Sequence, residues 1–236
     1  RKGNKTSSKF ISLKEVKNLK FEEKKKIQID LKKISSKRKN FLKFVNFSTP
    51  SIMGILNLTP DSFSDGGKFN DKEKSLKQLL KMIKSGADII DVGGESTRPG
   101  SKTINPKVEW QRIKDTVINF KKKYKNKCLS IDTRKSDLMV KCVKYGANLI
   151  NDVSGFEYDK KSIKKLKKFN IPKVLHHMQG TPKTMQKNPK YKNVLLDIYD
   201  FFEEKIKLIR FNGINHDKII IDPGIGFGKN LKHNMK

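Results

Sequence analysis

Cysteine is scarce in this chain of 236 residues, in which Cys128 and Cys142 are the only two. Their placement shows neither the spacing of a metal-ligand set nor the density of a disulfide framework. We therefore expect two partly buried thiols in a protein of a reducing compartment.

Long apolar runs are absent as well. No stretch approaches the roughly 18 consecutive apolar residues that a membrane-spanning helix needs. The chain also opens without the charged, apolar and small-residue pattern of a signal peptide. We expect a cytoplasmic protein that has no membrane partner.

Arginine is rare although the chain is strongly basic. The net charge is +30, yet only 6 of the 54 basic residues are Arg, and the lysines are spread along the whole chain. Proteins that read nucleic acids usually concentrate their charge and use Arg for bidentate contacts. The composition therefore argues against a nucleic-acid partner, whereas the positive field would attract small anions such as phosphate esters.

What the chain does contain, from residue 51 onward, is an alternation of short apolar runs with longer amphipathic ones. The predicted strands cover residues 51–56, 87–93, 128–132, 147–152, 173–178 and 218–222. The predicted helices lie near 71–85, 106–123, 135–145, 160–169 and 191–211. Such alternation indicates an α/β fold with a parallel sheet covered by helices.

Residues 1–49 differ from the rest, because they are rich in Lys and show only weak apolar periodicity. We interpret them as a basic, partly helical N-terminal extension with one helix near 13–35. Residues 50–236 form the main domain. A membrane surface or an acidic partner for the extension stays an open alternative.

Polar residues close every predicted strand. They are Asn57, Asp91, Asp132, Asn151 with Asp152, His177 and Asp222. In a closed barrel all strand ends meet at one mouth, whereas an open sheet gathers such groups only at its switch point. The pattern favours a TIM-type (β/α)8 barrel over the open doubly wound sheet.

Only about six of the eight βα units of such a barrel are present. The chain also begins with Arg and stops where a further helix would begin, near Asn230. We therefore expect a fragment that lacks the last two strands.

Six motifs carry a resemblance to a known family. They are IMGILNLTPDSFSDGG (52–67), IIDVGGESTRPGS (89–101), SIDTRK (130–135), NLINDVSG (148–155), HMQGTPKTMQ (177–186) and IIIDPGIGFGK (219–229). In this order they resemble the signatures of the dihydropteroate synthases, and six ordered motifs are far more specific than one.

The resemblance implies an eight-stranded barrel and a transferase of folate biosynthesis that is a target of sulfonamides. The family joins 4-aminobenzoate to 6-hydroxymethyl-7,8-dihydropterin diphosphate, giving 7,8-dihydropteroate and diphosphate. It also implies Mg²⁺ and a homodimer of the complete protein. Because family residues of the seventh and eighth strands have no counterpart here, the fragment alone is expected to be inactive.

The resemblance also implies a pterin pocket. A pterin offers amino and ring N–H groups that suit a buried carboxylate, with an amide on its remaining edge. The implied pterin-binding residues are Asp132, Asn151, Met178, Asp222, Gly226, Phe227 and Lys229. Catalysis is assigned to Asp132, Arg98 and Lys229. Alternatively, Asp222 is a plain turn residue of Asp-Pro-Gly, and Met178 is a core residue.

Two long loops after the first and second strands are predicted to be lids. Thr97 and Arg98 can hydrogen-bond the diphosphate, and Phe63, Ser64 and Pro99 are implied to hold the aminobenzoate ring and its surroundings. The resemblance makes Asn57 the protein ligand of Mg²⁺, which binds few protein groups directly.

His176 and His177 are neighbours on a predicted strand, so only one of them can face the barrel interior. The motif HMQG favours His177 for that position. Two rival functions remain open at this stage. One is a methyltetrahydrofolate-binding methyltransferase domain, which needs neither lid, and the other is a non-catalytic basic binding protein derived from the barrel.

Overall fold

The computed structural model describes residues 10–36, 42–59, 68–98 and 100–236. The chain divides into two compact units, residues 1–39 and 40–236, and each is described by itself. The first contains a short 3₁₀ helix, η1 (Glu15–Asn18), followed by α1 (Phe21–Ser35). A helix is present where the sequence predicts one, but the single helix expected over 13–35 is divided at Leu19 and Lys20, and the extension over residues 1–49 stays a prediction.

Among the described residues, no helix is long and apolar enough to cross a membrane.

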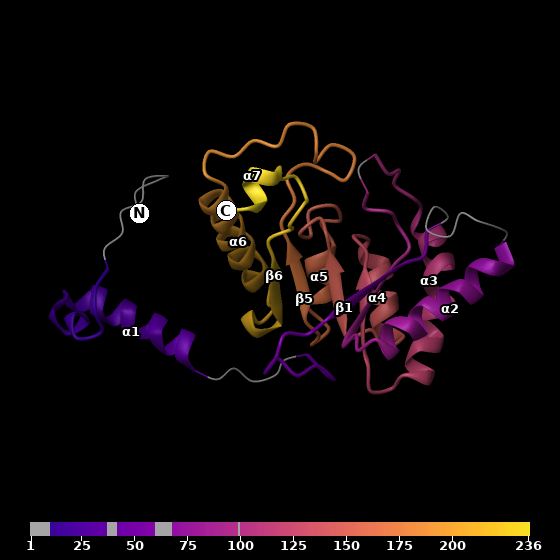
Figure 1. The fold of residues 1–236 in the computed structure, drawn as a ribbon, viewed down its shortest axis with the longest axis horizontal. Helices are drawn as coiled ribbons and strands as arrows, with labels where there is room; N and C mark the ends of the chain where they lie inside the picture. The colour runs from indigo at the N-terminus through magenta and orange to yellow at the C-terminus, as the bar shows by residue number, and fades with distance from the viewer. Residues whose placement is uncertain (1–9, 37–41, 60–67, 99) are drawn as a thin grey trace. The chain divides into compact units, whose positions relative to one another are not determined.

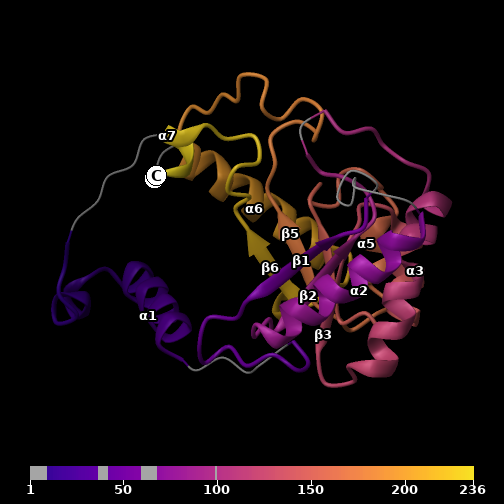
Figure 2. The same ribbon diagram turned by 45° about the vertical axis from the view of Figure 1, so that its right-hand side comes forward.

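The second unit is built on a six-stranded parallel sheet in the order β1-β2-β3-β4-β5-β6 (Figures 1 and 2). Its strands are β1 (Met53–Asn57), β2 (Ile89–Gly93), β3 (Cys128–Asp132), β4 (Leu149–Asp152), β5 (Lys173–His176) and β6 (Ile219–Asp222). Its helices are α2 (Lys68–Lys84), α3 (Pro106–Lys123), α4 (Ser136–Lys144), α5 (Ser162–Leu166), α6 (Val194–Phe211) and α7 (Leu231–Asn234), with a 3₁₀ turn, η3 (His216–Lys218), before β6. The predicted α/β class and its alternation of elements are confirmed.

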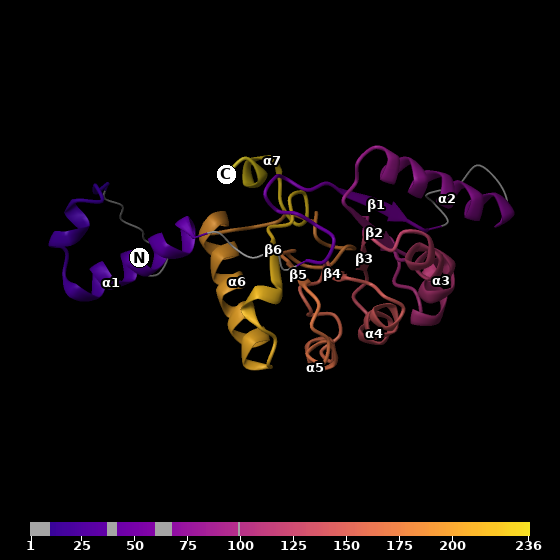
Figure 3. The ribbon, with the colours of Figure 1, turned by 90° about the horizontal axis from the view of Figure 1, so that it is seen from below.

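The strands form an arc, and helices α2 to α6 lie along its outer side (Figure 3). Between the two layers is the larger core, which contains Leu56, Val92, Ile131, Ile150 and Leu175 from the strands. These residues have the parity that points outward to the helices, so the opposite parity faces the inside of the arc. The sheet is therefore organised like a barrel wall.

The inside of the arc is apolar at the amino ends of the strands. Ile89, Cys128, Leu149 and Val174, one from each of four neighbouring strands, form a second buried cluster. Leu42 and Val45 pack into this cluster and are only 3% and 5% exposed. Leu42 and Val45 therefore cover the amino ends of the strands. Both residues belong to the N-terminal extension predicted from the sequence, and its domain boundary at residue 50 stays a prediction.

Local sequence explains where the longer helices begin. Asn105 caps α3 by accepting a hydrogen bond from the backbone N–H of Lys107, and Pro106 occupies the first helical position. Pro fits there because that N–H has no helical partner. The predicted range of this helix, 106–123, agrees with α3 in the structure.

The connection from β5 to α6 (residues 177–193) passes over the carboxyl ends of the strands (orange in Figure 1).

Candidate active site

The carboxyl ends of four strands meet on one level, and three of them carry polar side chains there. Asn57 pairs in register with Gly93, Gly93 with Asp132, and Asp132 with Asn151. Gly93 lies between Asn57 and Asp132, and a Cβ added to it would be crowded, at 3.3 Å from Oδ2 of Asp132 and 3.4 Å from Oδ1 of Asn57. The side-chain oxygens of Asn57 and Asp132 therefore both lie close to Gly93.

Asp91 lies one step deeper and is 2% exposed. Its Oδ2 accepts a hydrogen bond of 3.0 Å from the side-chain Nδ2 of Asn151. Within the described part of the chain, Oδ1 of Asp91 and Oδ1 of Asn151 are buried without a hydrogen-bond partner. Sequence reasoning counted Asp91 among the polar strand ends but did not assign it to the site, although its parity, shared with Gly93, was a usable signal.

The carboxyl groups in this region hold their protons unusually well. Burial raises the pKa of Asp132 well above its ordinary value, and the neighbouring carboxylates of Asp91 and Asp152 raise it further. Burial likewise raises the pKa of Asp91. Burial also raises the pKa of Asp152 to about 6, despite hydrogen bonds that its Oδ1 accepts from Ser154. Asp91 and Asp132 are thus shielded from solvent on the inner face of the sheet, whereas Asp152 has the parity of Ile150 and faces the helices.

Asp222 ends β6 and faces the same interior, since it shares the parity of Ile220, which packs against the inner cluster. Its Oδ1 accepts a hydrogen bond of 2.8 Å from the backbone N–H of Gly224. Gly224 has φ of +67°, and a Cβ added there would overlap the carbonyl oxygen of His177. Only glycine fits this position, so the Asp-Pro-Gly turn fixes the orientation of the Asp222 carboxylate.

The expectation that His177 faces the interior is wrong. His176 pairs in register with Asp222 and has the interior parity of Val174. His177 instead packs its ring against Phe201 of α6, with centroids 4.9 Å apart. β5 ends at His176, and strand parity, rather than the HMQG motif, decides which histidine points inward.

Lys229 is buried, and its ammonium is surrounded by acceptors of its own loop. It donates to the backbone oxygens of Gly224 (2.9 Å) and Phe227 (3.0 Å), and lies 3.0 Å from Nδ1 of His177. Burial lowers its pKa to about 8. These contacts are those of a loop anchor, and the catalytic and pterin-binding roles expected for Lys229 stay predictions.

The remaining predicted pterin residues lie nearby. Phe227 presents its ring edge-on to His176, with centroids 4.7 Å apart, and thus lies beside the interior face of β5. Gly226 is exposed with φ of +81°, and Met178 is half-buried just after β5. The structure places all three around the ends of β5 and β6, and their roles stay predictions.

The second predicted lid contains Thr97, which is half-buried, and Arg98, which is exposed. Both lie in the connection between β2 and α3, which starts at the carboxyl end of β2. Phe63, Ser64 and Pro99, predicted for the second substrate, lie outside the described residues.

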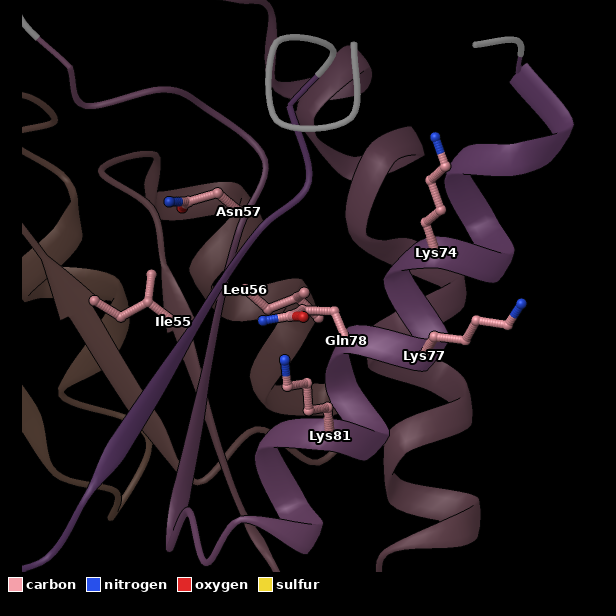
Figure 4. Close-up of a pocket in the computed structure, with 7 residues that line it drawn as sticks. All are labelled: Ile55, Leu56, Asn57, Lys74, Lys77, Gln78 and Lys81. Carbon is pink, nitrogen blue, oxygen red and sulfur yellow. The ribbon is translucent and has the colours of Figure 1, made fainter. Parts of the chain in front are cut away.

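A cavity of about 520 Å³ lies between β1 and α2 and includes Asn57 in its wall (Figure 4). Gln78 and Lys81 of α2 point towards β1, whereas Lys77 points away and pairs with Glu73. The lysines Lys74, Lys77 and Lys81 make the α2 side of this cavity basic, whereas the side chain of Asn57 points away from α2 (Figure 4).

No three His, Cys, Asp or Glu side chains meet as a metal cluster in the described ranges. This does not conflict with the predicted Mg²⁺ at Asn57, because Mg²⁺ is usually held by one or two protein oxygens together with substrate phosphates.

Comparison with known proteins agrees with this geometry. Residues 53–236 match the family described as pterin binding enzyme. A dihydropteroate synthase of Clostridium beijerinckii is 44% identical over 185 residues, which are 78% of this chain and 66% of that protein. The chain therefore spans about two thirds of the length of this relative.

Solved structures show the same likeness. Yersinia pestis dihydropteroate synthase with a sulfonamide drug complex superposes with a TM-score of 0.75 at 40% identity, covering 81% of this chain and 69% of that one. Xanthomonas albilineans dihydropteroate synthase with 4-aminobenzoic acid gives 0.74 at 34% identity, covering 81% and 67%. The predicted TIM-type barrel fold is confirmed, with six strands in the described residues. The chain belongs to the pterin binding enzyme family and, within it, is similar to the dihydropteroate synthases.

Proposed function

We propose that the protein is a dihydropteroate synthase, which joins 6-hydroxymethyl-7,8-dihydropterin diphosphate to 4-aminobenzoate and releases diphosphate. The observation that carries the proposal is the convergence of Asp132, Asn151 and Asp222 on the inner face of the sheet at the carboxyl ends of their strands. The identity to named synthases supports the same conclusion.

In the proposed complex the pterin binds inside the sheet. The Asp222 carboxylate, held by Gly224, accepts from the amino and ring N–H groups of the pterin. The amide of Asn151 donates to Asp91, which leaves its oxygen free to accept from the ligand. Asp132, in register beside Asn151, completes this wall.

The reaction breaks the bond between the pterin methylene carbon and the diphosphate oxygen, and forms a bond from that carbon to the amine nitrogen. The diphosphate leaves with the bonding electron pair, and the amine afterwards loses one proton. Arg98 and Thr97 hydrogen-bond the diphosphate, for which the guanidinium fork is well suited. The protein's further tasks are to orient the ring and to exclude water.

Mg²⁺ is part of this proposal. The oxygens of Asn57 and Asp132, on either side of Gly93, form a donor set of the kind that Mg²⁺ prefers. When bound there, the ion would supply positive charge to the diphosphate. The homodimer and the cytoplasmic location stay predictions from the sequence.

The proposal is tested with the full-length protein by measuring diphosphate release from the two substrates. Asp222→Asn should weaken binding of the dihydropterin diphosphate by roughly 1.5–3 kcal/mol, the contribution of a hydrogen bond to a charged group. Asp217→Asn is a matched control, because Asp217 is exposed and precedes the same strand. Unchanged binding in Asp222→Asn would refute the pocket, and methyl transfer from methyltetrahydrofolate in place of diphosphate release would refute the synthase.

A further inference from the structure

The connection between β2 and α3, residues 94–105, carries Thr97 and Arg98 and is held at its base by one carboxylate. Glu95 is 7% exposed. Its Oε1 accepts a hydrogen bond of 2.9 Å from the backbone N–H of Ile104, and its Oε2 accepts one of 2.7 Å from Nε of Arg134. A single side chain thus ties the start of the loop to its end.

Arg134, which follows β3, extends this contact to two further places. Its Nη2 donates to the hydroxyl of Thr103 over 2.9 Å, at the end of the same loop. Its guanidinium lies 4.1 Å from the ring centroid of Tyr158, in the connection after β4. Arg134 therefore joins the connections that follow β2, β3 and β4.

Lys135 adds a second basic partner for Glu95 at the base of the loop. Its ammonium lies 3.0 Å from Oε1 of Glu95 and pairs with the carboxylate of Glu109, which is fully buried on α3. Burial raises the pKa of Glu95, but hydrogen bonds from Arg134, Ile104 and Lys135 outweigh it, so the pKa lies below the ordinary value. Breaking such a buried network leaves an uncompensated charge, so the base resists movement.

The tip of the same loop is different. Arg98 is exposed, and among the described residues its guanidinium makes no hydrogen bond or ion pair. Gly100 has φ of +83°, and a Cβ added there would meet nothing within 4 Å. The backbone of Arg98 makes local hydrogen bonds, from its N–H to Oγ of Ser96 and from the N–H of Ser101 to its carbonyl oxygen, and these do not involve Glu95 or Arg134.

We propose that Glu95 and Arg134 form a clamp that fixes the base of this loop, so that closure over the second substrate is confined to the tip with Thr97 and Arg98. Arg134 is then a positioning residue. It touches neither the pterin nor the reacting atoms, and it sets where Arg98 starts its approach. This inference rests on the proposed synthase function.

The test compares Arg134→Gln with the parent in the full-length protein. We expect the KM for 4-aminobenzoate to rise about tenfold, equivalent to the loss of one charge-assisted hydrogen bond. Binding of 6-hydroxymethyl-7,8-dihydropterin, which carries no diphosphate, should stay within about twofold, since that pocket is untouched. Thr103→Val removes one exposed contact of Arg134 and should give a smaller rise without a loss of folding.

Lys207→Gln is the control, because it removes an exposed ion pair with Glu203 on a different helix, α6. An unchanged KM in both Arg134→Gln and Thr103→Val overturns the proposal. So does an equal loss of pterin binding, which would mean a general structural role.

Hydrogen exchange of the Ile104 amide gives a readout that needs no activity. Arg134→Gln should accelerate this exchange in the unliganded protein, while exchange in β3 stays the same. If the parent shows no synthase activity but the exchange result holds, the clamp stands and the proposed function fails. If exchange is unchanged, the clamp itself is wrong.

Discussion

Asp91 and Asn151 are joined by a hydrogen bond of 3.0 Å that passes from β2 to β4 across the intervening strand β3. An asparagine amide can be turned either way, and the face it offers depends on its neighbours. Because the Asp91 carboxyl takes the Nδ2 group, Asn151 is held with its oxygen available to a ligand.

Replacing Asp91 with Ala should therefore weaken pterin binding. The change leaves the buried Nδ2 of Asn151 without its acceptor, which costs about 1–3 kcal/mol. Rotation of the amide would recover this free energy, but the Asn151 oxygen would then no longer be available to the ligand. Calorimetric titration with 6-hydroxymethyl-7,8-dihydropterin measures the effect. Asp91→Asn keeps an acceptor of the same shape and should lose less; equal losses for the two variants would contradict this role.

Replacing Gly224 with Ala should both destabilise the protein and weaken pterin binding. The new methyl group would overlap the carbonyl of His177, and the shift would carry away the N–H that holds Asp222. Gly213→Ala is a matched control, because its φ of +90° is also left-handed but its surroundings are open. Thermal unfolding should show a loss of about 1 kcal/mol for the control, from backbone strain alone, and clearly more for Gly224→Ala. Similar losses would show that the overlap is absorbed.

Replacing Leu42 with Ala should lower the free energy of unfolding by about 2–5 kcal/mol, as for other buried leucines. Leu42 is 3% exposed and packs on the inner cluster at the amino ends of the strands. Denaturant titration of the variant measures the loss, with the exposed Leu195→Ala as the control. A loss no larger than that of the control would mean that residues 42–45 do not close this end.

Asp152 should make stability depend on pH. Its pKa is raised from 3.8 to about 6, so the folded state binds more protons than the unfolded state between these values. The stability that Asp152 contributes is therefore fully present below about pH 4 and is lost as the pH rises through about 6. The parent minus Asp152→Asn difference in unfolding free energy should fall across this window by on the order of 2–3 kcal/mol. Denaturant titration at several pH values measures it, and a difference that is flat or rises with pH would contradict the assignment.

The sequence predicted the fold well wherever local and overall signals agree. The strand at 128–132 is a short run of mostly apolar residues, and the helix at 106–123 begins with an Asn cap followed by Pro. Both elements therefore have clear boundaries in the sequence. α1 was predicted too long, since its first part has many lysines and no side-chain cap to define a start. Leu42 and Val45 were not predicted as core, because their burial depends on strands that lie far along the chain.

The site was predicted in part for similar reasons. Asp132, Asn151 and Asp222 are strand ends, and parallel strands bring such ends together whatever their side chains do. His176 was assigned wrongly because a motif was preferred to strand parity, and parity is set by where β5 ends. The hydrogen bond between Arg134 and Glu95 could not be predicted. Contacts between loops depend on side-chain conformations, which the spacing of residues in the sequence does not encode.

The closed amino end of the sheet has a consequence for Cys128. This thiol is fully buried in the cluster that Leu42 and Val45 cover, and burial raises its pKa to about 12. Because the thiolate is the reactive form, alkylating reagents and oxidants have almost nothing to attack while the cover is in place. The rate at which Cys128 is alkylated in dilute denaturant is then a direct chemical record of how often this end of the sheet opens.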